Sequence, residues 1–415
     1  MLCFRSKVSH LMIQKLWAEH KKALLRTAIL IMLVAALVWL GYEFWRLWQP
    51  RLKGAVDLKH LHRFTQDWFS GKPVYRERSS VYPPATYAIL WPLLGWLTLP
   101  MARWIYAASA MFALAWCIGF VVRECRAAGF LERAFAALIP CSMYATGAAI
   151  GNGQFTVQII AALASGLVMT RRDPRGWHAR ILMPALILMA FIKPSIAVFF
   201  FWILLFVPDS PRPALLVMSG YISLTLFAAA FQEGSLVTLT REWLIHASHV
   251  GNRGGGTGNV ANLHIWLTTF GLREWSLPVS MVVLLALGLW IYSHRRVELW
   301  LLLAVTAYVA RIGTYHRWYE DLLILLPMVA FFRIAKERSS SSNTGILAGI
   351  LLAATMLASL APGGLFLFPA PWNSRYVAGQ VVVWVAGLVF LLRQAWVERR
   401  KISFPLTDFT VESQS

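Results

Sequence analysis

The stretch from Thr27 to Tyr42 reads TAILIMLVAALVWLGY and contains no charged side chain. Met281–Tyr292 (MVVLLALGLWIY) and Val377–Leu392 (VAGQVVVWVAGLVFLL) repeat this pattern far along the chain. With their flanks these runs approach the roughly 20 residues that a helix needs to cross a hydrocarbon layer about 30 Å thick. Lipid offers the backbone no hydrogen-bond partners, so such runs are expected to be helical. The sequence therefore predicts an all-α, polytopic integral membrane protein.

The composition of the whole chain agrees with this class. Hydrophobic residues make up 58% of the 415 residues and charged residues only 14%, against about 25% charged in soluble proteins. The net charge is +20. In a membrane protein such an excess is expected at cytoplasmic helix ends and against anionic lipid headgroups. No basic face with stacking aromatic residues lies outside the apolar runs, so nucleic acid is not an expected partner. The four cysteines form no C-x-x-C pair, which disfavours a disulfide framework or a zinc site.

Hydropathy and length predict roughly eleven to thirteen membrane segments in a single helical bundle. They lie near 27–46, 84–98, 102–122, 131–149, 154–170, 181–207, 212–231, 277–293, 297–312, 319–334, 344–361 and 376–393. Residues 84–98 are short and bounded by prolines, and 181–207 is interrupted by Lys193-Pro194. Either of these two is expected to be a half-helix or a hairpin.

The basic residues predict the orientation of the bundle. We expect three parts: a basic N-terminus (1–26), one transmembrane domain (27–394) and a C-terminal tail (395–415). Both termini are expected to be cytoplasmic. The cations concerned are Lys21, Lys22, Arg26, Arg171, Arg172, Arg175, Arg180, Arg333, Lys336, Arg338, Arg393, Arg399, Arg400 and Lys401. If every segment crossed the membrane, the loop of Arg171 would lie on the extracytoplasmic side. Whether the two interrupted segments cross the membrane is left open.

Two long loops are expected on the extracytoplasmic side, at 47–82 and 232–275. The first breaks the positive-inside rule, so its cations are expected to serve another purpose. They are Arg51, Lys53, Lys59, Arg63, Lys72, Arg76 and Arg78. The second carries apolar residues at helical spacing, Leu236, Leu239 and Trp243. This stretch predicts a helix on the membrane surface or, alternatively, a tether. A glycine-rich stretch, GNRGGGTGNVANLH, follows it.

Asp57 is a candidate general base in the first of these loops. One partly desolvated carboxylate at a membrane surface can deprotonate an alcohol that attacks an electrophilic sugar carbon. The structural alternative is a helix N-cap, because Asp57 precedes a helical pattern of Leu58, Leu61 and Phe64. Asp67, further along the same stretch, is expected to be an ordinary solvated residue.

Candidate sugar contacts follow in two short motifs. Tyr82, in VYPPATYAILWP, could stack on a sugar ring or a prenyl chain, or anchor the chain at the interface. The turn GNGQ (Gly151–Gln154) joins two apolar runs. The amides of Asn152 and Gln154 can bind sugar hydroxyls, although a turn between helices also favours Gly and Asn.

Candidate phosphate ligands lie later in the chain. Lys193 stands inside an apolar segment, where a cation costs several kcal/mol unless it is paired or hydrated. It could bind a phosphate or extend to the interface by its flexible stem. RIGTYHRWYEDLLILLP (Arg311–Pro327) concentrates charges at the mouth of a segment: Arg311, His316, Arg317, Glu320 and Asp321. They suit an anionic ligand with a proton-handling group, or helix capping by Glu320 and Asp321.

Several enzyme classes lack their motifs in this sequence. No G-x-x-x-x-G-K, G-x-S-x-G or H-E-x-x-H is present. No Asp-x-Asp pair is available to hold a divalent ion between pyrophosphate oxygens. A nucleotide-sugar enzyme of the soluble kind is disfavoured, and neither a metal nor a cofactor is expected.

The motifs together resemble glycosyltransferase family 87, membrane enzymes of the GT-C superfamily that use polyprenyl-phosphate mannose as α-1,2-mannosyltransferases. The resemblance rests on an early loop Asp with G-x-P-x-Y (Gly71–Tyr75) and YPP (Tyr82–Pro84). GNGQ is similar to the family's Gly-Gln element, IKP (Ile192–Pro194) to its Lys-Pro element and YHRWYEDLLILLP to its late motif. These matches occur in the family's order over about residues 30–330.

The resemblance implies a GT-C-like fold and a role for each candidate. Asp57 would be the general base for inverting transfer of a hexose, mannose by resemblance, from a polyprenyl-phosphate donor to a lipid or glycan acceptor. Lys193, Arg311 and His316 would hold the leaving phosphate. Tyr82, Asn152 and Gln154 would contact sugar or acceptor, as would Asp321 unless it orients His316 or caps its helix. Leu-Lys-His follows Asp57 where the family is rich in aromatic residues, so Asp67 is the alternative base.

Two other functions compete with this one. A lipid-linked glycan ligase or polymerase would use the same kind of donor. A solute transporter or lipid flippase is the alternative from another class, and its mark is an internal duplication with matching broken helices. The sequence shows one broken segment and no partner for it. The expected location is a bacterial inner membrane, with the active site on the extracytoplasmic side and membrane lipids as neighbours.

Overall fold

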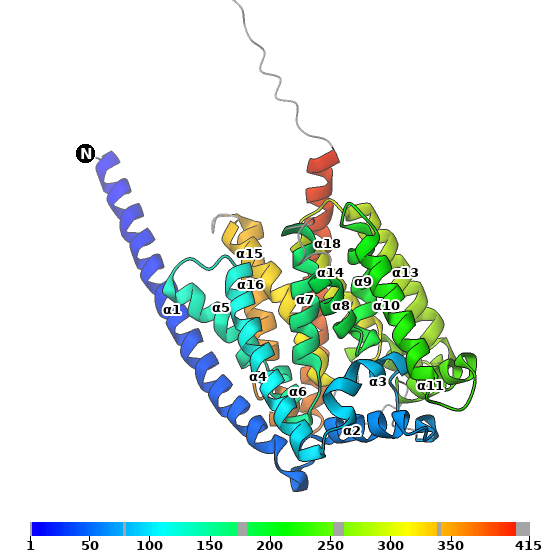
Figure 1. Ribbon diagram of the computed structural model, residues 1–415. Helices are drawn as coiled ribbons and strands as arrows, with labels where there is room; N and C mark the ends of the chain where they lie inside the picture. Colours follow the sequence, from blue (N-terminus) through cyan, green and yellow to red (C-terminus); the bar gives the residue numbers. More distant parts are fainter. Residues whose placement is uncertain (1, 78–79, 173–180, 252–260, 338–341, 404–415) are drawn as a thin grey trace, which may run out of the picture.

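The computed structural model describes residues 2–77, 80–172, 181–251, 261–337 and 342–403, and these form an all-helical protein without a β-strand. Long helices stand side by side, and several short ones cover one end (Figure 1). The helices of the first half are α1 (Leu2–Leu47), α2 (Val56–Phe69), α3 (Pro84–Leu90), α4 (Leu99–Glu124), α5 (Phe130–Ser142), α6 (Tyr144–Asn152), α7 (Thr156–Arg172), α8 (Met183–Ala190) and α9 (Pro194–Phe206). Those of the second half are α10 (Arg212–Ala229), α11 (Leu236–Gly251), α12 (Leu263–Thr269), α13 (Ser276–His294), α14 (Leu299–Gly313), α15 (Leu325–Glu337), α16 (Asn343–Ser359), α17 (Gly364–Leu367) and α18 (Trp372–Ser403).

Five helical stretches in the described residues are long and apolar enough to cross a membrane: Lys22–Leu47, Leu99–Glu124, Arg212–Ala229, Arg273–His294 and Trp372–Ile402. Each coincides with a segment predicted from hydropathy. Much of their apolar surface faces outward, as expected of helices in contact with lipid. The prediction of a membrane-embedded helical protein is confirmed at this level.

The other predicted segments are shorter or interrupted. Residues 84–98 form only α3 and a π-helical turn, Trp91–Gly95. The segment predicted at 131–149 is divided at Met143 into α5 and α6. α6 and α7 meet at an angle of 120°, and taken together they are also long and apolar enough to cross a membrane. The total of eleven to thirteen membrane segments therefore stays a prediction.

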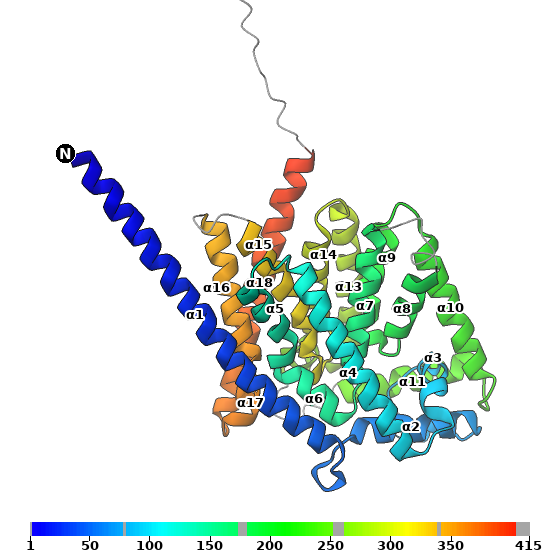
Figure 2. The same ribbon diagram turned by 60° about the vertical axis from the view of Figure 1, so that its left-hand side comes forward.

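The segment predicted at 181–207 is two helices that meet at Lys193. Pro194 begins α9 and has no backbone N–H, so it cannot continue the hydrogen-bond ladder of α8. α8 begins, and α9 ends, at the end of the bundle where α7 ends (Figures 1 and 2). The junction lies deeper, where the Thr86 hydroxyl of α3 donates to the Ile192 carbonyl over 2.9 Å. The segment is therefore a hairpin that returns to the side from which it came.

The predicted cytoplasmic cations that belong to the described residues lie together at one end of the bundle. The N-terminus and the C-terminal end of α18 lie at this end (Figure 1). The end of α7 joins it through Arg171, whose Nη2 donates to the Val297 carbonyl before α14 over 2.8 Å. Arg126, just after α4, forms a 2.7 Å salt bridge with Glu337 of α15. Arg171 precedes the hairpin and lies at the same end as the termini because residues 84–98 form only α3 and a π-helical turn. The hairpin at Lys193 then keeps later cations such as Arg333 at that end.

Both predicted long loops lie at the opposite end and contain helices. The loop at 47–82 contains α2, and the amphipathic stretch after residue 235 is α11 (Figure 2). Trp68 of α2 donates its indole N–H to the Ala228 carbonyl of α10 over 2.8 Å. Trp243 of α11 donates to the Val81 carbonyl over 3.0 Å. Tryptophan side chains thus attach these helices to the bundle, which favours a surface helix over a tether.

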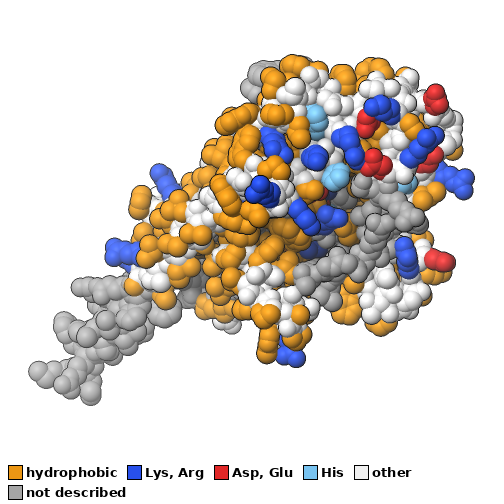
Figure 3. Space-filling view, turned by 90° about the horizontal axis from the view of Figure 1, so that it is seen from below, with side chains coloured by type: hydrophobic (Ala, Val, Ile, Leu, Met, Phe, Trp, Pro, Cys, Tyr) orange, Lys and Arg blue, Asp and Glu red, His pale blue; other side chains and the backbone are white. Residues whose placement is uncertain are grey.

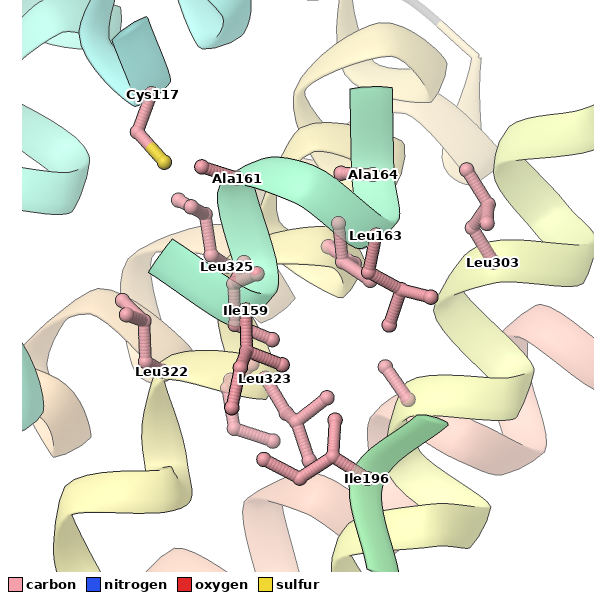
Figure 4. Packing of buried hydrophobic residues seen from close by; sticks show 14 of the residues in the cluster. Cys117, Ile159, Ala161, Leu163, Ala164, Ile196, Leu303, Leu322, Leu323 and Leu325 are labelled. Carbon is pink, nitrogen blue, oxygen red and sulfur yellow. The ribbon is translucent and has the colours of Figure 1, made fainter. Parts of the chain in front are cut away.

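The centre of the bundle is a close-packed apolar core. Ile159 and Leu163 of α7 pack with Leu323 beside the start of α15, and Ile196 of α9 and Leu303 of α14 lie in the same cluster (Figure 4). Small residues on α7 such as Ala161 and Ala164 allow neighbouring helices to come close (Figure 4). This packing holds the ends of α6, α7, α9 and α14 in fixed positions.

Parts of the sequence predictions lie outside the described residues. Arg78, Arg175, Arg180 and Arg338 belong to the undescribed stretches, as does most of the glycine-rich segment after α11.

Gly153 provides a test of the fold at the α6–α7 junction. Its φ of +74° is left-handed, and a Cβ there would come within 2.4 Å of the Leu58 Cβ. We expect Gly153→Ala to lower the stability of the purified protein by about 2–4 kcal/mol, since backbone strain and overpacking add. Thermal unfolding in detergent measures the loss. The control is Gly349→Ala in α16, where nothing lies within 4 Å. Equal melting temperatures for the two variants would contradict the packing described.

Candidate functional site

Four segments from distant parts of the sequence meet at the end of the bundle opposite the termini. They are the start of α2, the turn between α6 and α7, the α8–α9 junction and the 3₁₀ helix Trp318–Ile324. Each carries a motif selected from the sequence. Seen from this end, Lys and Arg side chains gather on one part of the face together with Asp, Glu and His side chains, and a mainly hydrophobic area adjoins them (Figure 3).

Lys193 lies at the centre of this meeting point. Its ammonium group forms a salt bridge with Glu320 of the 3₁₀ helix. It also donates to Gln154 Oε1 over 3.4 Å, and Nζ lies 4.9 Å from the ring centroid of Tyr319. The side chain is 13% exposed. An ammonium group has three N–H donors, so one remains for a further ligand.

Glu320 is a buried carboxylate with a full set of partners. His316 lies 2.7 Å from Glu320 Oε2 through Nδ1, and the backbone N–H of Arg317 donates to the same oxygen over 2.9 Å. The other ring nitrogen of His316 lies 2.9 Å from the Thr314 hydroxyl. Glu320 therefore caps the 3₁₀ helix, as the sequence alternative held, and also pairs with Lys193. A buried charge of this kind is stable because it is both paired and hydrogen-bonded.

Asp57 is half-buried in the first turn of α2 and is not the N-cap. The N-cap is Ala55, with φ of 53°, and no side chain caps the helix there. Within the part of the chain that the structure describes, Asp57 makes no hydrogen bond and no salt bridge. Its carboxylate interacts electrostatically with Lys193 and with Arg317. It is thus an acid without a hydrogen-bond or salt-bridge partner that lies within electrostatic range of two cations.

Tyr82 and Gln154 lie beside Lys193. Tyr82 interacts with Gln154 and with the charges of Lys193 and Asp57. Burial raises the pKa of the Tyr82 phenol, which therefore stays neutral and can donate a hydrogen bond. Gln154 also donates from Nε2 to the Tyr319 hydroxyl over 3.1 Å. The predicted sugar contacts Tyr82 and Gln154 thus share one surface with Lys193.

Asn152 has other contacts. Its Nδ2 donates to the Ala148 carbonyl over 2.9 Å, and Oδ1 accepts a long 3.4 Å hydrogen bond from Arg46 of α1. Arg46 in turn forms a 2.6 Å salt bridge with Glu43. These contacts join the end of α6 to α1, and among the described residues no hydrogen bond joins Asn152 to Lys193.

Arg311 and Asp321 form a separate buried ion pair. Asp321 accepts from Arg311 Nε and from the Tyr144 hydroxyl. The Arg311 guanidinium also donates to the Ala261 carbonyl over 3.3 Å and lies 5.0 Å from the ring centroid of Trp384. Both charges are almost fully buried. The pair joins α14 to the 3₁₀ helix, and the Arg311 charge is already balanced.

Arg317 is an exposed cation on the same motif that the predicted ligand set did not include. Its Nε donates to the Tyr315 hydroxyl over 2.9 Å. Among the described residues its two Nη groups have no hydrogen-bond partner. It faces Asp57 electrostatically, which Arg311 is not found to do. The sequence showed Arg317 inside the same charged motif as Arg311. It could not tell their roles apart, because the two differ in burial, which is a property of the folded protein.

Asp67, the alternative base, lies further along α2. It forms a 3.1 Å salt bridge with Lys72, which is 69% exposed. No interaction between Asp67 and Lys193 or Arg317 is found in the described residues. Of the two carboxylates, Asp57 is therefore the one at the meeting point.

His264 of α12 contributes a second histidine near the motif. Its Nε2 lies 2.7 Å from the Ser280 hydroxyl. Burial, together with the nearby His316, lowers the pKa of His264 to about 4. His264 is therefore neutral at physiological pH. Across the described residues, no three His, Cys, Asp or Glu side chains are placed to hold a metal ion, and the expected absence of a metal stays a prediction.

An open apolar groove lies apart from these residues. It has a volume of about 560 Å³ and runs along α11, with Leu236, Leu244 and Ile245 on one side and Leu277 of α13 on the other. Arg241 lines it as well. The groove is suited to an apolar chain, whereas the cluster around Lys193 is suited to polar groups.

Comparison of the chain with protein-family models, with curated proteins and with solved structures finds no match in any of the three.

The buried pair of Arg311 and Asp321 provides a stability test. Asp321→Ala leaves the Arg311 charge buried without its partner, and we expect a loss of about 3–5 kcal/mol. Asp67→Ala breaks the exposed pair with Lys72 and should change stability by less than about 1 kcal/mol. Thermal unfolding of both variants in the same detergent measures the difference. If Asp321→Ala were as mild as Asp67→Ala, the pair would not hold these segments together.

Proposed function

We propose that the protein is a membrane glycosyltransferase that moves a hexose from a polyprenyl-phosphate donor to a lipid or glycan acceptor. The observation that carries this proposal is the Asp57 carboxylate, half-buried and without a direct partner, facing Lys193 and Arg317. A partnerless acid is available to accept a proton. Arg317 has two Nη groups without partners in the described residues, and Lys193, although paired with Glu320, keeps one N–H donor for a phosphate. No cofactor is required, because the donor brings its own leaving group.

The proposed reaction is a single displacement. Asp57 accepts the proton of the acceptor hydroxyl as its oxygen attacks the anomeric carbon of the donor sugar. The new C–O bond forms as the bond from the anomeric carbon to the phosphate oxygen breaks. The products are the glycosylated acceptor and polyprenyl phosphate, and the configuration at the anomeric carbon is inverted.

Two cations are suited to the departing phosphate. Lys193 retains one N–H donor after its bonds to Glu320 and Gln154. Arg317 has two Nη groups without partners among the described residues, and its planar guanidinium matches phosphate oxygens. Cations positioned before the reaction stabilise the negative charge that develops on the phosphate. In this proposal His316 keeps Glu320 in place, and the buried Arg311 has a structural role.

Different residues are suited to the sugar and to the prenyl chain of the donor. Tyr82 and Gln154 lie beside Lys193 and can contact the hydroxyl groups of a sugar held there. The apolar groove along α11 is suited to part of the prenyl chain, and α11 is joined to the Tyr82 segment by the hydrogen bond of Trp243 to Val81. The proposed location is an inner membrane with this end extracytoplasmic, since the end that carries both termini holds the predicted cytoplasmic cations.

The proposed base is tested with purified protein, a prenyl-phosphate mannose and candidate acceptors. We expect Asp57→Asn to reduce the release of prenyl phosphate by a factor of about 10²–10⁴, the usual contribution of a general base. Thermal unfolding should be unchanged, because Asp57 makes no direct contact in the described residues. Asp67→Asn, on the same helix, is the matched control and should retain activity. Full activity of Asp57→Asn would refute the assignment.

The phosphate contact is tested at Arg317. We expect Arg317→Gln to raise the KM for the donor more than the KM for the acceptor, because the cation contacts only the phosphate. Arg63→Gln is the control, since Arg63 is an exposed cation of the same face that is already paired with Glu77. Equal effects of Arg317→Gln on both substrates would show that Arg317 does not contact the phosphate.

A further inference from the structure

A second concave site lies at the other end of the bundle, where both termini are. It is a pocket of about 190 Å³ between the turn that follows α13 and the last turns of α18. Its polar lining comes from Ser293, His294, Arg295, Arg296 and Arg399. Three guanidinium groups from two separate elements therefore converge on one small volume.

Among the residues that the structure describes, no carboxylate lines this pocket. The nearest acids along the two elements, Glu298 and Glu398, have contacts elsewhere. Glu298 forms a salt bridge with Arg333, and its backbone N–H donates to Glu398 over 2.8 Å. Arg171 of α7 interacts electrostatically with both acids. The positive charge of the pocket lining is thus not balanced from within it.

The guanidinium groups retain donors for a ligand. Arg295 donates from Nη1 to the Tyr292 carbonyl over 3.0 Å and lies 4.4 Å from the ring centroid of Tyr292, which leaves its other N–H groups available. Arg296 and Arg399 are exposed and have no hydrogen-bond partner among the described residues. His294 lies in the field of Arg399. Convergent N–H donors of this kind match the oxygens of a phosphate group.

The apolar helices beside the pocket indicate that such a phosphate would belong to a lipid. α13 and α18 both belong to the stretches that are long and apolar enough to cross a membrane. On α13 the side chains of Val282, Leu285 and Leu289 are 65%, 53% and 74% exposed, and they follow one side of the helix toward the pocket. Acyl chains can lie against this surface while the headgroup remains at the helix ends.

We propose that this pocket binds the phosphate of an anionic phospholipid headgroup. The chemistry shared by all candidate ligands is a phosphate ester, and the lipid source follows from the apolar surface of α13 below the pocket. The site is at the opposite end from Asp57, so it is independent of the proposed sugar transfer. Bound lipid would link the ends of α13 and α18 by bridging Arg296 and Arg399.

The test is lipid binding by the full chain in detergent, measured by native mass spectrometry with phosphatidylglycerol. We expect Arg296→Gln with Arg399→Gln to weaken binding by about 30-fold, since each cation near an anionic headgroup contributes about 1 kcal/mol. Arg393→Gln with Arg400→Gln is the matched control. It removes two exposed cations of α18 that do not line the pocket, and it should leave the affinity unchanged.

Two further binding measurements distinguish an anionic lipid from a zwitterionic lipid and from free phosphate. Phosphatidylcholine, which is zwitterionic, should bind the wild-type protein no better than it binds the Arg296/Arg399 variant. Inorganic phosphate at the lipid's concentration should not displace phosphatidylglycerol. The proposal is overturned if the control pair weakens binding as much as the pocket pair does. It is also overturned if phosphatidylcholine binds equally well, or if inorganic phosphate alone competes fully.

Discussion

The salt bridge between Lys193 and Glu320 is the contact on which the candidate site depends. It lies where α8 and α9 meet, inside apolar surroundings, and an unpaired charge there would be costly. Pairing places the start of α9 against the 3₁₀ helix, and Gln154 and Tyr319 join the same ammonium group. The Glu320 carboxylate is in turn held by His316. Asp57 and Arg317 lie around this centre, and no hydrogen bond or salt bridge joins them in the described residues.

Much of the fold was predictable because hydropathy is a local property. Five uninterrupted apolar runs became the five long spanning helices. The break at Lys193-Pro194 was visible for the same reason, since a proline without a donor ends a helix. Whether the broken segment crosses the membrane or turns back was not predictable. That depends on contacts such as the hydrogen bond from Thr86 to Ile192, which join residues far apart in the sequence.

The sequence predicted which residues form the candidate site better than it predicted which residues they pair with. Asp57, Tyr82, Gln154 and Lys193 were selected from separate motifs, and they lie together. Arg311 and Arg317 belong to one motif and could not be told apart, because their burial depends on packing. Arg311 lies buried in the last turn of α14, and Arg317 lies exposed beyond the end of that helix. The N-cap alternative for Asp57 was wrong, since a left-handed Ala55 takes that position. The pairing of Lys193 with Glu320 left no local signal in either motif.

The two ends of the bundle are both basic, but their cations have different surroundings. At one end they are placed around an acid that can take a proton, and at the other they line a pocket to which the described residues contribute no acid. The central claim is that a lipid phosphate binds between Lys193 and Arg317. A cryo-electron microscopy map of the protein in a nanodisc with polyprenyl phosphate tests it most directly. Phosphate density within hydrogen-bonding distance of both cations, facing Asp57, is the predicted result. A bound polyprenyl phosphate whose phosphate lies elsewhere, with this cluster unchanged, would contradict the account.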